Sequence, residues 1–272
     1  LLDDMELERA RGITIKARAG CMHYERDGVQ YELNLIDTPG HVDFQYEVSR
    51  SMACCEGALL LVDAFQGVEA QTVANTYSAV EHDLHILTAI NKIDLSHARP
   101  DEVADEIEQS LGLDVADLLH VSAKAGKGIG ELMDAIIEQF PPPTGDPAKP
   151  LTAMVFDSHY DEFRGAITYV RVMDGMVRKG QKIRFIRGGS EHEVLELGQF
   201  VPQQQSCDQL QAGQVGYLIC NIKLLEDVLI GDTITLASAK EVEPLAGYQE
   251  PRRMVYCGLY PSDGQDFKEL RD

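Results

Sequence analysis

The sequence lacks long apolar runs and closely spaced cysteines. No apolar stretch approaches the roughly 20 residues that a membrane-spanning helix needs, which argues against a chain that spans a bilayer. The six cysteines include no CxxC pair, so no zinc cluster or redox motif is indicated. Several stand among apolar residues, where a thiol acts as a small hydrophobe. We expect reduced thiols with no disulfide partner, in a cytoplasmic protein.

Basic residues are also scarce. The chain has 24 Lys and Arg against 45 Asp and Glu, for a net charge of −21. A protein that grips RNA through a broad basic surface has the opposite balance. Any basic contact surface should therefore be local, or lie outside these residues.

A glycine-rich phosphate cradle of the form GxxxxGK[ST] is absent from the 272 residues. Both ends also look cut. The chain starts with Leu1 and a charged segment, without an initiator Met or a signal-peptide pattern. Residues 267–272 have the pattern of the first turn of an amphipathic helix, and the sequence stops there. We expect the true protein to extend beyond both ends, and these residues alone to bind a nucleoside triphosphate poorly and to hydrolyse it negligibly.

The length of 272 residues favours two domains and part of a third. Residues 1–140 alternate short apolar runs with helical patterns, which is typical of an α/β domain with parallel strands and crossover helices. The expected strands are Tyr31–Asp37, Ala58–Asp63, His85–Asn91 and Leu118–Ser122. The expected helices are Val42–Cys55, Glu69–His82, Asp101–Leu111 and Ile129–Phe140.

Residues 141–150, PPPTGDPAKP, predict a stiff linker. Over residues 151–243 the apolar period changes to two, which predicts a compact β-barrel with positive-φ turns at Asp174-Gly175 and Gly188-Gly189. Its expected strands include Thr168–Val172, Lys182–Ile186, Val194–Leu197 and Thr233–Leu236. Residues 244–272, with a strand at Met254–Tyr260, predict the incomplete start of an α+β domain.

A DTPGH motif follows the apolar residues Leu33–Ile36, at a carboxyl strand edge where α/β sheets bind ligands. A carboxylate there can hold Mg²⁺, and a glycine can bring its backbone N–H against a terminal phosphate oxygen. The same letters also suit a plain tight turn, and a histidine beside a turn is often only a surface residue. The candidate residues are Asp37, Thr38, Pro39, Gly40 and His41.

An NKID motif, Asn91, Lys92, Ile93 and Asp94, ends another predicted strand. The Asp94 carboxylate can accept hydrogen bonds from the N1–H and the exocyclic amine of guanine, a pair of donors that adenine lacks. Lys92 can lay its aliphatic stem along the base, and Asn91 can join neighbouring loops through its amide. The alternative is a strand end with a capping Asn and a solvated Lys.

Ser122, Ala123 and Lys124 follow the last predicted strand, where the Ala123 backbone N–H could reach guanine O6. The order DTPG, NKID, SAK, each after its own strand, favours a site for GTP or GDP. Upstream, Thr14 in RGITI could place its hydroxyl in the Mg²⁺ shell and so order its loop, although an ordinary turn before a strand fits the same letters.

The sequence resembles the translational GTPases of the elongation factor 4 (LepA) family across essentially its whole length. The discriminating stretches are LDDMELERARGITIKA, DTPGHVDFQYEVSRSMACCEGALLLVDA, FDSHYDEFRGAI and GLYPSD. Elongation factor G shares DTPGHVDF and then diverges. Gln45, Phe65 and Gly20-Cys21 depart from the family pattern but leave the motif positions intact.

The resemblance implies a truncated P-loop-type GTPase domain, a translation-factor β-barrel and the start of an elongation factor G-like domain. His41 would orient the attacking water once the ribosome positions it, Thr14 and Asp37 would serve Mg²⁺, and Asn91 with Asp94 would select guanine. The implied activity is ribosome-dependent GTP hydrolysis that remobilises or back-translocates ribosomes under stress, in the cytoplasm or peripherally on the cytoplasmic face of the membrane.

Three other functions fit parts of the sequence. An elongation factor G-like translocation GTPase shares the switch motifs. A nucleotide-independent, ribosome-binding module fits the missing phosphate cradle. An ATPase fits less well, because Asp94 suits guanine.

Overall fold

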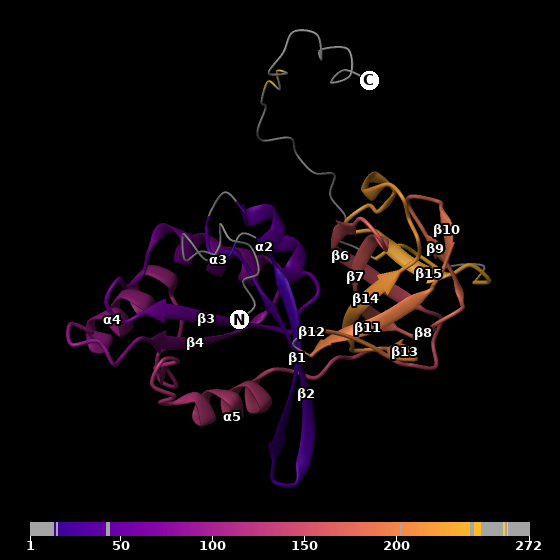
Figure 1. Cartoon of the computed structure of the whole chain (residues 1–272). Helices are drawn as coiled ribbons and strands as arrows, with labels where there is room; N and C mark the ends of the chain where they lie inside the picture. Colours follow the sequence, from indigo (N-terminus) through magenta and orange to yellow (C-terminus); the bar gives the residue numbers. More distant parts are fainter. Residues whose placement is uncertain are drawn as a thin grey trace.

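The computed structural model describes residues 14, 16–41, 44–201, 203–239, 242–245, 258 and 260. Figure 1 shows two parts: a β-hairpin, a small sheet and helices from the first half of the chain, and a β-rich part from the second half. Within the described residues, no helix combines the length and the apolar character that crossing a membrane requires. The third domain expected from residue 244 onward falls almost entirely outside them.

A three-stranded parallel sheet forms the centre of the first part. It contains β3 (Gly57–Asp63), β4 (His85–Asn91) and β5 (Leu119–His120), in that order. Apolar side chains of α4 (Pro100–Leu111) cover one face and those of α5 (Ile129–Gln139) the other. The predicted parallel α/β arrangement of these strands is confirmed, although β5 is shorter than expected.

The helix boundaries follow local sequence signals. Pro100 stands at the first turn of α4, and Gly112 ends the helix in the left-handed region at φ 66°, where a side chain would be strained. α5 ends at Gln139, just before the Pro141–Pro143 run. The remaining helices are α2 (Gln45–Met52), inside the expected Val42–Cys55, and α3 (Ala70–Glu81).

For one strand, the predicted pairing is wrong. We expected Tyr31–Asp37 to join the parallel sheet, but β2 (Val29–Asp37) pairs antiparallel with β1 (Arg18–Arg26) in a separate hairpin. The Asp27-Gly28 turn explains this: both residues have positive φ, 52° and 76°, which suits a two-residue hairpin. Among the described strands, β3 pairs only with β4, and Leu61 on β3 is 51% exposed.

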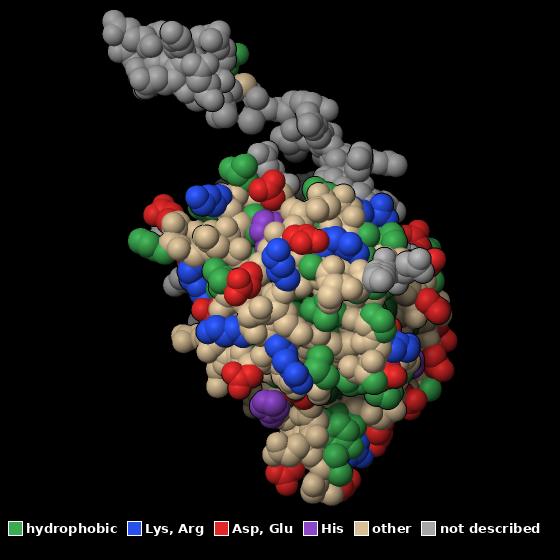
Figure 2. All heavy atoms as spheres, turned by 90° about the vertical axis from the view of Figure 1, so that its right-hand side faces the viewer, with side chains coloured by type: hydrophobic (Ala, Val, Ile, Leu, Met, Phe, Trp, Pro, Cys, Tyr) green, Lys and Arg blue, Asp and Glu red, His purple; other side chains and the backbone are tan. Residues whose placement is uncertain are grey.

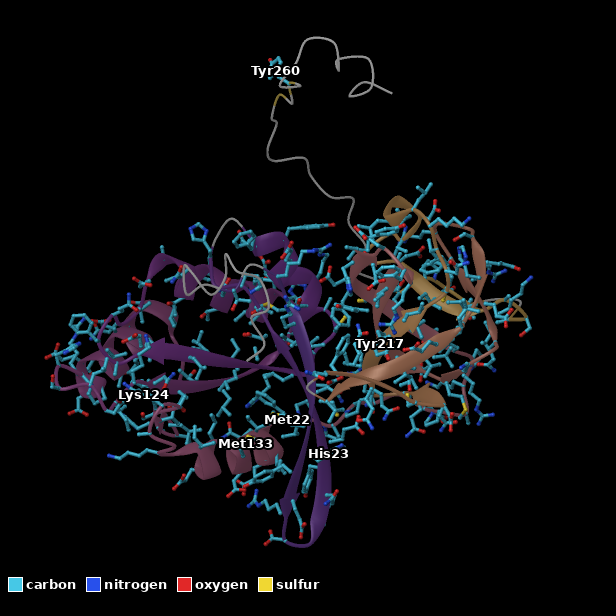
Figure 3. The ribbon with its side chains drawn as sticks, viewed as in Figure 1. Met22, His23, Lys124, Met133, Tyr217 and Tyr260 are labelled. Carbon is cyan, nitrogen blue, oxygen red and sulfur yellow. The ribbon has the colours of Figure 1, made fainter. Side chains whose placement is uncertain are left out.

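The hairpin is anchored on both sides. Near its tip, Tyr24 Oη donates to Asp134 Oδ1 at 3.3 Å, and Arg26 forms an ion pair with Glu138, both acceptors lying on α5. Figure 3 labels Met133 on α5 and, on the hairpin beside it, Met22 and His23. On the other side Glu32 Oε1 accepts from Gln199 Nε2 at 2.9 Å, so the hairpin bridges α5 and the second part.

The second part is antiparallel, as the period of two predicted. Its main sheet has the order β10-β9-β15-β6-β7-β14-β11-β12, and a separate pair, β13-β8, packs over the same apolar core. Gly175 and Gly189 have φ of 75° and 70°, so the two expected turns are confirmed. The strands are β6 (Thr152–Asp161), β7 (Gly165–Asp174), β8 (Met176–Arg178), β9 (Lys182–Phe185), β10 (Glu191–Glu193), β11 (Glu196–Val201), β12 (Gln203–Ser206), β13 (Gln209–Gln211), β14 (Val215–Ile219) and β15 (Thr233–Leu236).

The proline-rich segment 141–150 contains neither helix nor strand, as predicted. It lies against the barrel rather than free in solution, because the Asp146 N–H donates to Asp174 Oδ1 at 2.8 Å and a side chain on Gly145 would collide with Met173 O. Acidic and basic side chains are interspersed on the barrel face turned to the viewer in Figure 2. A broad basic surface does not occupy this face.

An apolar cluster joins the two parts. Ala19 of β1 and Cys54, just after α2, are buried with barrel residues that include Met154, Phe156 and Ile167. Cys54 is 3% exposed, which confirms that this thiol packs as a small hydrophobe. The elements that carry the predicted switch segments therefore run directly into the barrel contact.

A cavity of about 430 Å³ lies beside this cluster, lined by Lys16, by Glu47 and Arg50 of α2, by Asp157 of β6, and by apolar residues in and after the short 3₁₀ helix η2 (Leu225–Asp227), namely Leu225, Val228 and Ile230. Burial raises the pKa of Glu47 and of Asp157 above their usual values. The nearby Asp157 carboxylate raises the pKa of Glu47 further, whereas the positive charges of Lys16 and Arg50 act to lower the pKa of both groups. Ionising these carboxyls therefore opposes close contact between α2 and the barrel.

We predict that the free energy of unfolding of Asp157→Asn, relative to that of the wild type, increases as the pH rises. A carboxyl whose pKa is raised by folding stabilises the fold below its unfolded-state pKa, and this contribution is lost as the pH rises through the folded-state pKa. The neutral amide avoids that loss. The measurement is urea unfolding of variant and wild type at several pH values between about 4 and 7.

Asp161→Asn, on the same strand, is the control of opposite sign. Backbone N–H groups of Arg164 and Phe163 lower the pKa of Asp161, so this carboxylate stabilises the fold at higher pH and its contribution is lost as the pH falls. If both variants change stability in the same direction with pH, the assignment for Asp157 is wrong.

Candidate functional site

The NKID loop begins where β4 ends, and Asn91 joins it to the SAK segment. Asn91 Oδ1 accepts the backbone N–H of Lys92 at 2.8 Å and that of Ala123 at 3.1 Å. Lys92 has φ 66°, so the chain turns sharply directly after the strand. The expected tie between neighbouring loops is therefore present in the geometry.

Asp94 meets the same segment through Ser122. Ser122 Oγ donates to Asp94 Oδ1 at 2.6 Å, and this hydrogen bond is the main cause that lowers the pKa of Asp94. Ser122 itself is fully buried, and its oxygen also accepts the Ala125 N–H at 3.1 Å. Asp94 is thus held ionised and exposed, as an acceptor for two neighbouring donors must be.

The turn after Ser122 is closed by the backbone. Ser122 and Lys127 exchange N–H···O bonds of 3.0 and 3.1 Å, and Gly126 and Gly128 supply positive φ. A side chain on Gly128 would collide with His120 O. Lys124 lies exposed on this turn, near the carboxyl ends of β3 and β4 (Figure 3).

The backbone amide of Ala123 has a partner within the protein. In this structure the Ala123 N–H donates to Asn91 Oδ1 at 3.1 Å, and its expected contact with guanine O6 stays a prediction. The amide is thereby used to hold the two loops together. Ile93 also serves the scaffold, because its N–H donates to Val121 O at 3.4 Å and its side chain packs on the core under α4.

Asp63, at the end of β3, joins the site although the sequence analysis did not single it out. Lys92 Nζ lies 2.6 Å from Asp63 Oδ2. Burial raises the pKa of Asp63, but Lys92 and the backbone N–H groups of Phe65 and Gln66 outweigh it, and the pKa is lowered overall. Its place at the carboxyl end of an apolar strand, like that of Asn91, was the available signal.

The DTPGH loop lies at the end of the hairpin strand β2. Asp37 stands opposite Arg18 of β1, Thr38 is half-buried and Pro39 is buried. Asn75 of α3 donates to Gly40 O at 3.4 Å. His41 is exposed, with its ring centroid 6.1 Å from that of Phe44.

Gly40 has open space where a side chain would be, with no heavy atom within 4 Å of an added Cβ. A ligand could therefore approach this backbone without meeting a side chain, and the contact with a phosphate stays a prediction. The loop follows the β1–β2 hairpin and the NKID–SAK assembly lies on the β3–β4–β5 sheet, so the two parts of the candidate site stand on different sheets, with Asn75 of α3 linking the loop to the second sheet.

Mg²⁺ suits the donor types on the phosphate side, because it prefers oxygen ligands and usually keeps several waters beside one or two carboxylates. Asp37 and Thr14 would supply a carboxylate and a hydroxyl. Within the part of the chain that the structure describes, no group of three or more His, Cys, Asp or Glu side chains could form a metal cage.

We predict that Asn91→Ala loosens the tie between the NKID and SAK segments. The change removes the acceptor of two backbone N–H groups, for a loss of about 1 kcal/mol per hydrogen bond in the free energy of unfolding. Hydrogen exchange of the Ala123 amide should accelerate. Asn91→Asp keeps the acceptor oxygen and is the control; if it accelerates exchange as much as alanine does, the oxygen is not what holds the loops.

Comparison with known proteins agrees with this geometry. The profile of the elongation factor Tu GTP binding domain matches residues 1–142, and that of elongation factor Tu domain 2 matches residues 165–235. Elongation factor 4 1 of Rhodopirellula baltica is 70% identical over 272 residues, and elongation factor 4 of Synechococcus elongatus is 56% identical over the same length.

Both alignments cover 100% of this chain but only 45% of each relative, so the chain spans less than half the length of the proteins it matches. The first match covers β1 to α5, and the second covers most of the barrel, leaving β6 outside it. The chain therefore belongs to the translational GTPases that carry the elongation factor Tu GTP-binding domain, within the elongation factor 4 family.

Proposed function

We propose that the full-length protein is a ribosome-dependent GTPase of the elongation factor 4 type, which hydrolyses GTP to GDP and phosphate. The observation that carries the proposal is the NKID–SAK assembly, in which Asn91, Asp94 and Ser122 are held together by hydrogen bonds at the carboxyl ends of β4 and β5. Guanine is favoured because the ionised Asp94 carboxylate matches its N1–H and exocyclic amine. Lys92 would cover one face of the base.

On the phosphate side, Gly40 would donate its backbone N–H to the γ-phosphate, and His41 would orient the attacking water. The chemistry is direct attack of water on the γ-phosphorus, helped by positioning and charge stabilisation. Mg²⁺, when bound through Asp37 and Thr14, would neutralise phosphate charge. The chain's own contribution is to aim the backbone amide and the imidazole at the reacting group.

A phosphate-binding loop must come from outside these residues. Among the described strands β3 pairs only with β4 and Leu61 is exposed, so we propose that a further strand, carrying such a loop, pairs with this edge. We infer that these 272 residues alone are inactive, because they lack this loop. The upstream coding sequence tests this: a GxxxxGK[ST] motif before Leu1 supports the enzyme, whereas a genuine start codon at this point supports a non-catalytic, ribosome-binding module.

Within translation, we propose that the protein remobilises or back-translocates ribosomes and supports protein synthesis under stress. This role rests on the family resemblance, as does a peripheral association with the cytoplasmic face of the membrane. An elongation factor G-like translocation activity is the alternative. A toeprinting assay on pre- and post-translocation ribosomes separates them, because the direction of ribosome movement differs.

We predict that His41→Ala in the full-length protein lowers ribosome-stimulated kcat by about a hundredfold or more, because positioning the water is lost. Binding of GDP should be unchanged, since His41 faces the phosphate side. Single-turnover GTP hydrolysis and GDP titration measure the two effects. Gln45→Ala, at the exposed start of α2, is the control and should hydrolyse GTP like the wild type.

Guanine selection has its own test. Fluorescent GDP bound to the full-length protein should be displaced by GTP but not by ATP at the same concentration. Asp94→Ala should weaken GDP binding, because the acceptor of both guanine donors is removed. Equal displacement by ATP and GTP would contradict the role given to Asp94.

A further inference from the structure

Helix α2 connects the DTPGH loop to the barrel. It starts at Gln45, soon after His41, and ends at Met52, from which a short turn leads to Glu56 and β3. Its eight residues span about 12 Å as a stiff rod. The position of its far end therefore constrains the position of the loop.

The far end is seated in the barrel by two neighbouring contacts. Cys54 Sγ lies 3.5 Å from Met154 Sδ inside the apolar cluster shared by the two parts. Beside it, the two terminal nitrogens of the Arg171 guanidinium donate to the Glu56 carboxylate: Nη2 lies 2.6 Å from Oε1 and Nη1 lies 3.4 Å from Oε2. Met154 and Arg171 are direct partners across β6 and β7, so the contacts form one patch.

Arg171 is a rigid anchor. Its strand β7 lies between β6 and β14, and the residue is only 4% exposed. A guanidinium buried this deeply is strongly unfavourable unless an anion neutralises it. Glu56, from the other part of the molecule, supplies that anion.

Gly57, the residue after Glu56, packs closely against Phe140, on the side away from the barrel. A Cβ on Gly57 would lie 2.6 Å from the ring of Phe140, at the end of α5. The junction between α2 and β3 is therefore held between the barrel and α5. It has little freedom to move while Arg171 is in place.

We propose that Arg171 is a positioning residue for GTP hydrolysis: by holding Glu56, the barrel fixes the end of α2 and, through this helix, the loop that carries His41. The inference rests on the proposed GTPase activity. The barrel would thereby control catalysis without touching the nucleotide. Arg171 acts on the loop and not on the base, which is held by the separate NKID–SAK assembly.

The test uses the full-length protein with ribosomes and GTP. Arg171→Met removes the charge and keeps much of the apolar stem; we expect kcat to fall about tenfold while KM for GTP stays within about twofold. Glu56→Gln should act in the same direction, and the double variant should be no worse than Arg171→Met, because both changes break one interaction. Arg171→Lys keeps the charge but not the two parallel hydrogen bonds, so its kcat should lie between those of Arg171→Met and the wild type.

Arg164→Met is the matched control. Arg164 Nη2 also lies 2.6 Å from a glutamate oxygen, Glu196 Oε1, but both residues belong to the barrel. This variant should lower the stability of the barrel and leave kcat unchanged. Equal losses of kcat in Arg171→Met and Arg164→Met would mean that barrel stability alone matters, and would overturn the proposal.

Hydrogen exchange without ribosomes gives an independent readout. Residues 45–52 should exchange several-fold faster in Arg171→Met and Glu56→Gln than in the wild type or in Arg164→Met. If the wild type hydrolyses no GTP, the proposed function fails while this measurement still reports on the coupling. If α2 exchanges at the wild-type rate in both Arg171→Met and Glu56→Gln, the anchoring role is wrong; should Arg171→Met not fold, Glu56→Gln decides alone.

Discussion

The close contact between the end of α2 and the barrel is the constraint on which the arrangement of the two parts depends. Cys54 and Ala19 bury their side chains among Met154, Phe156 and Ile167, and beside them the buried Arg171 side chain pairs with the partly exposed Glu56. In such surroundings a lost partner leaves an uncompensated charge, so the pair favours one docked geometry strongly. Both segments that lead from the candidate phosphate side, β1 and α2, enter this contact.

The base side and the phosphate side obtain their order in different ways. Asn91, Asp94 and Ser122 are tied by short hydrogen bonds within one sheet, so the base side is complete within the first part of the molecule. The DTPGH loop stands on a separate hairpin and is held by Asn75 of α3. Its position therefore depends on what α2 and the hairpin contact, including the barrel.

The acidic residues of the chain divide by environment. Asp94 and Asp63 lie at strand ends, where a hydrogen bond from Ser122 lowers the pKa of Asp94 and Lys92 lowers that of Asp63, so both remain charged and can accept hydrogen bonds. Glu47 and Asp157 line the cavity between α2 and the barrel, where burial raises their pKa values. A net charge of −21 thus contains carboxylates suited to binding and others that oppose close packing.

The amino-acid sequence by itself determined the local features. Alternating periods indicated the α/β part and the barrel, Pro141–Pro143 marked where the helix before the linker ends, and the NKID and SAK motifs marked the residues that meet at the strand ends. Such signals are local, because each depends on residues close in sequence. Only the tertiary structure showed that β2 pairs with β1, that Asp63 binds Lys92, that Ala123 donates to Asn91, and that Arg171 holds Glu56. These pairings join residues far apart in sequence or choose among several available partners, and packing decides between them.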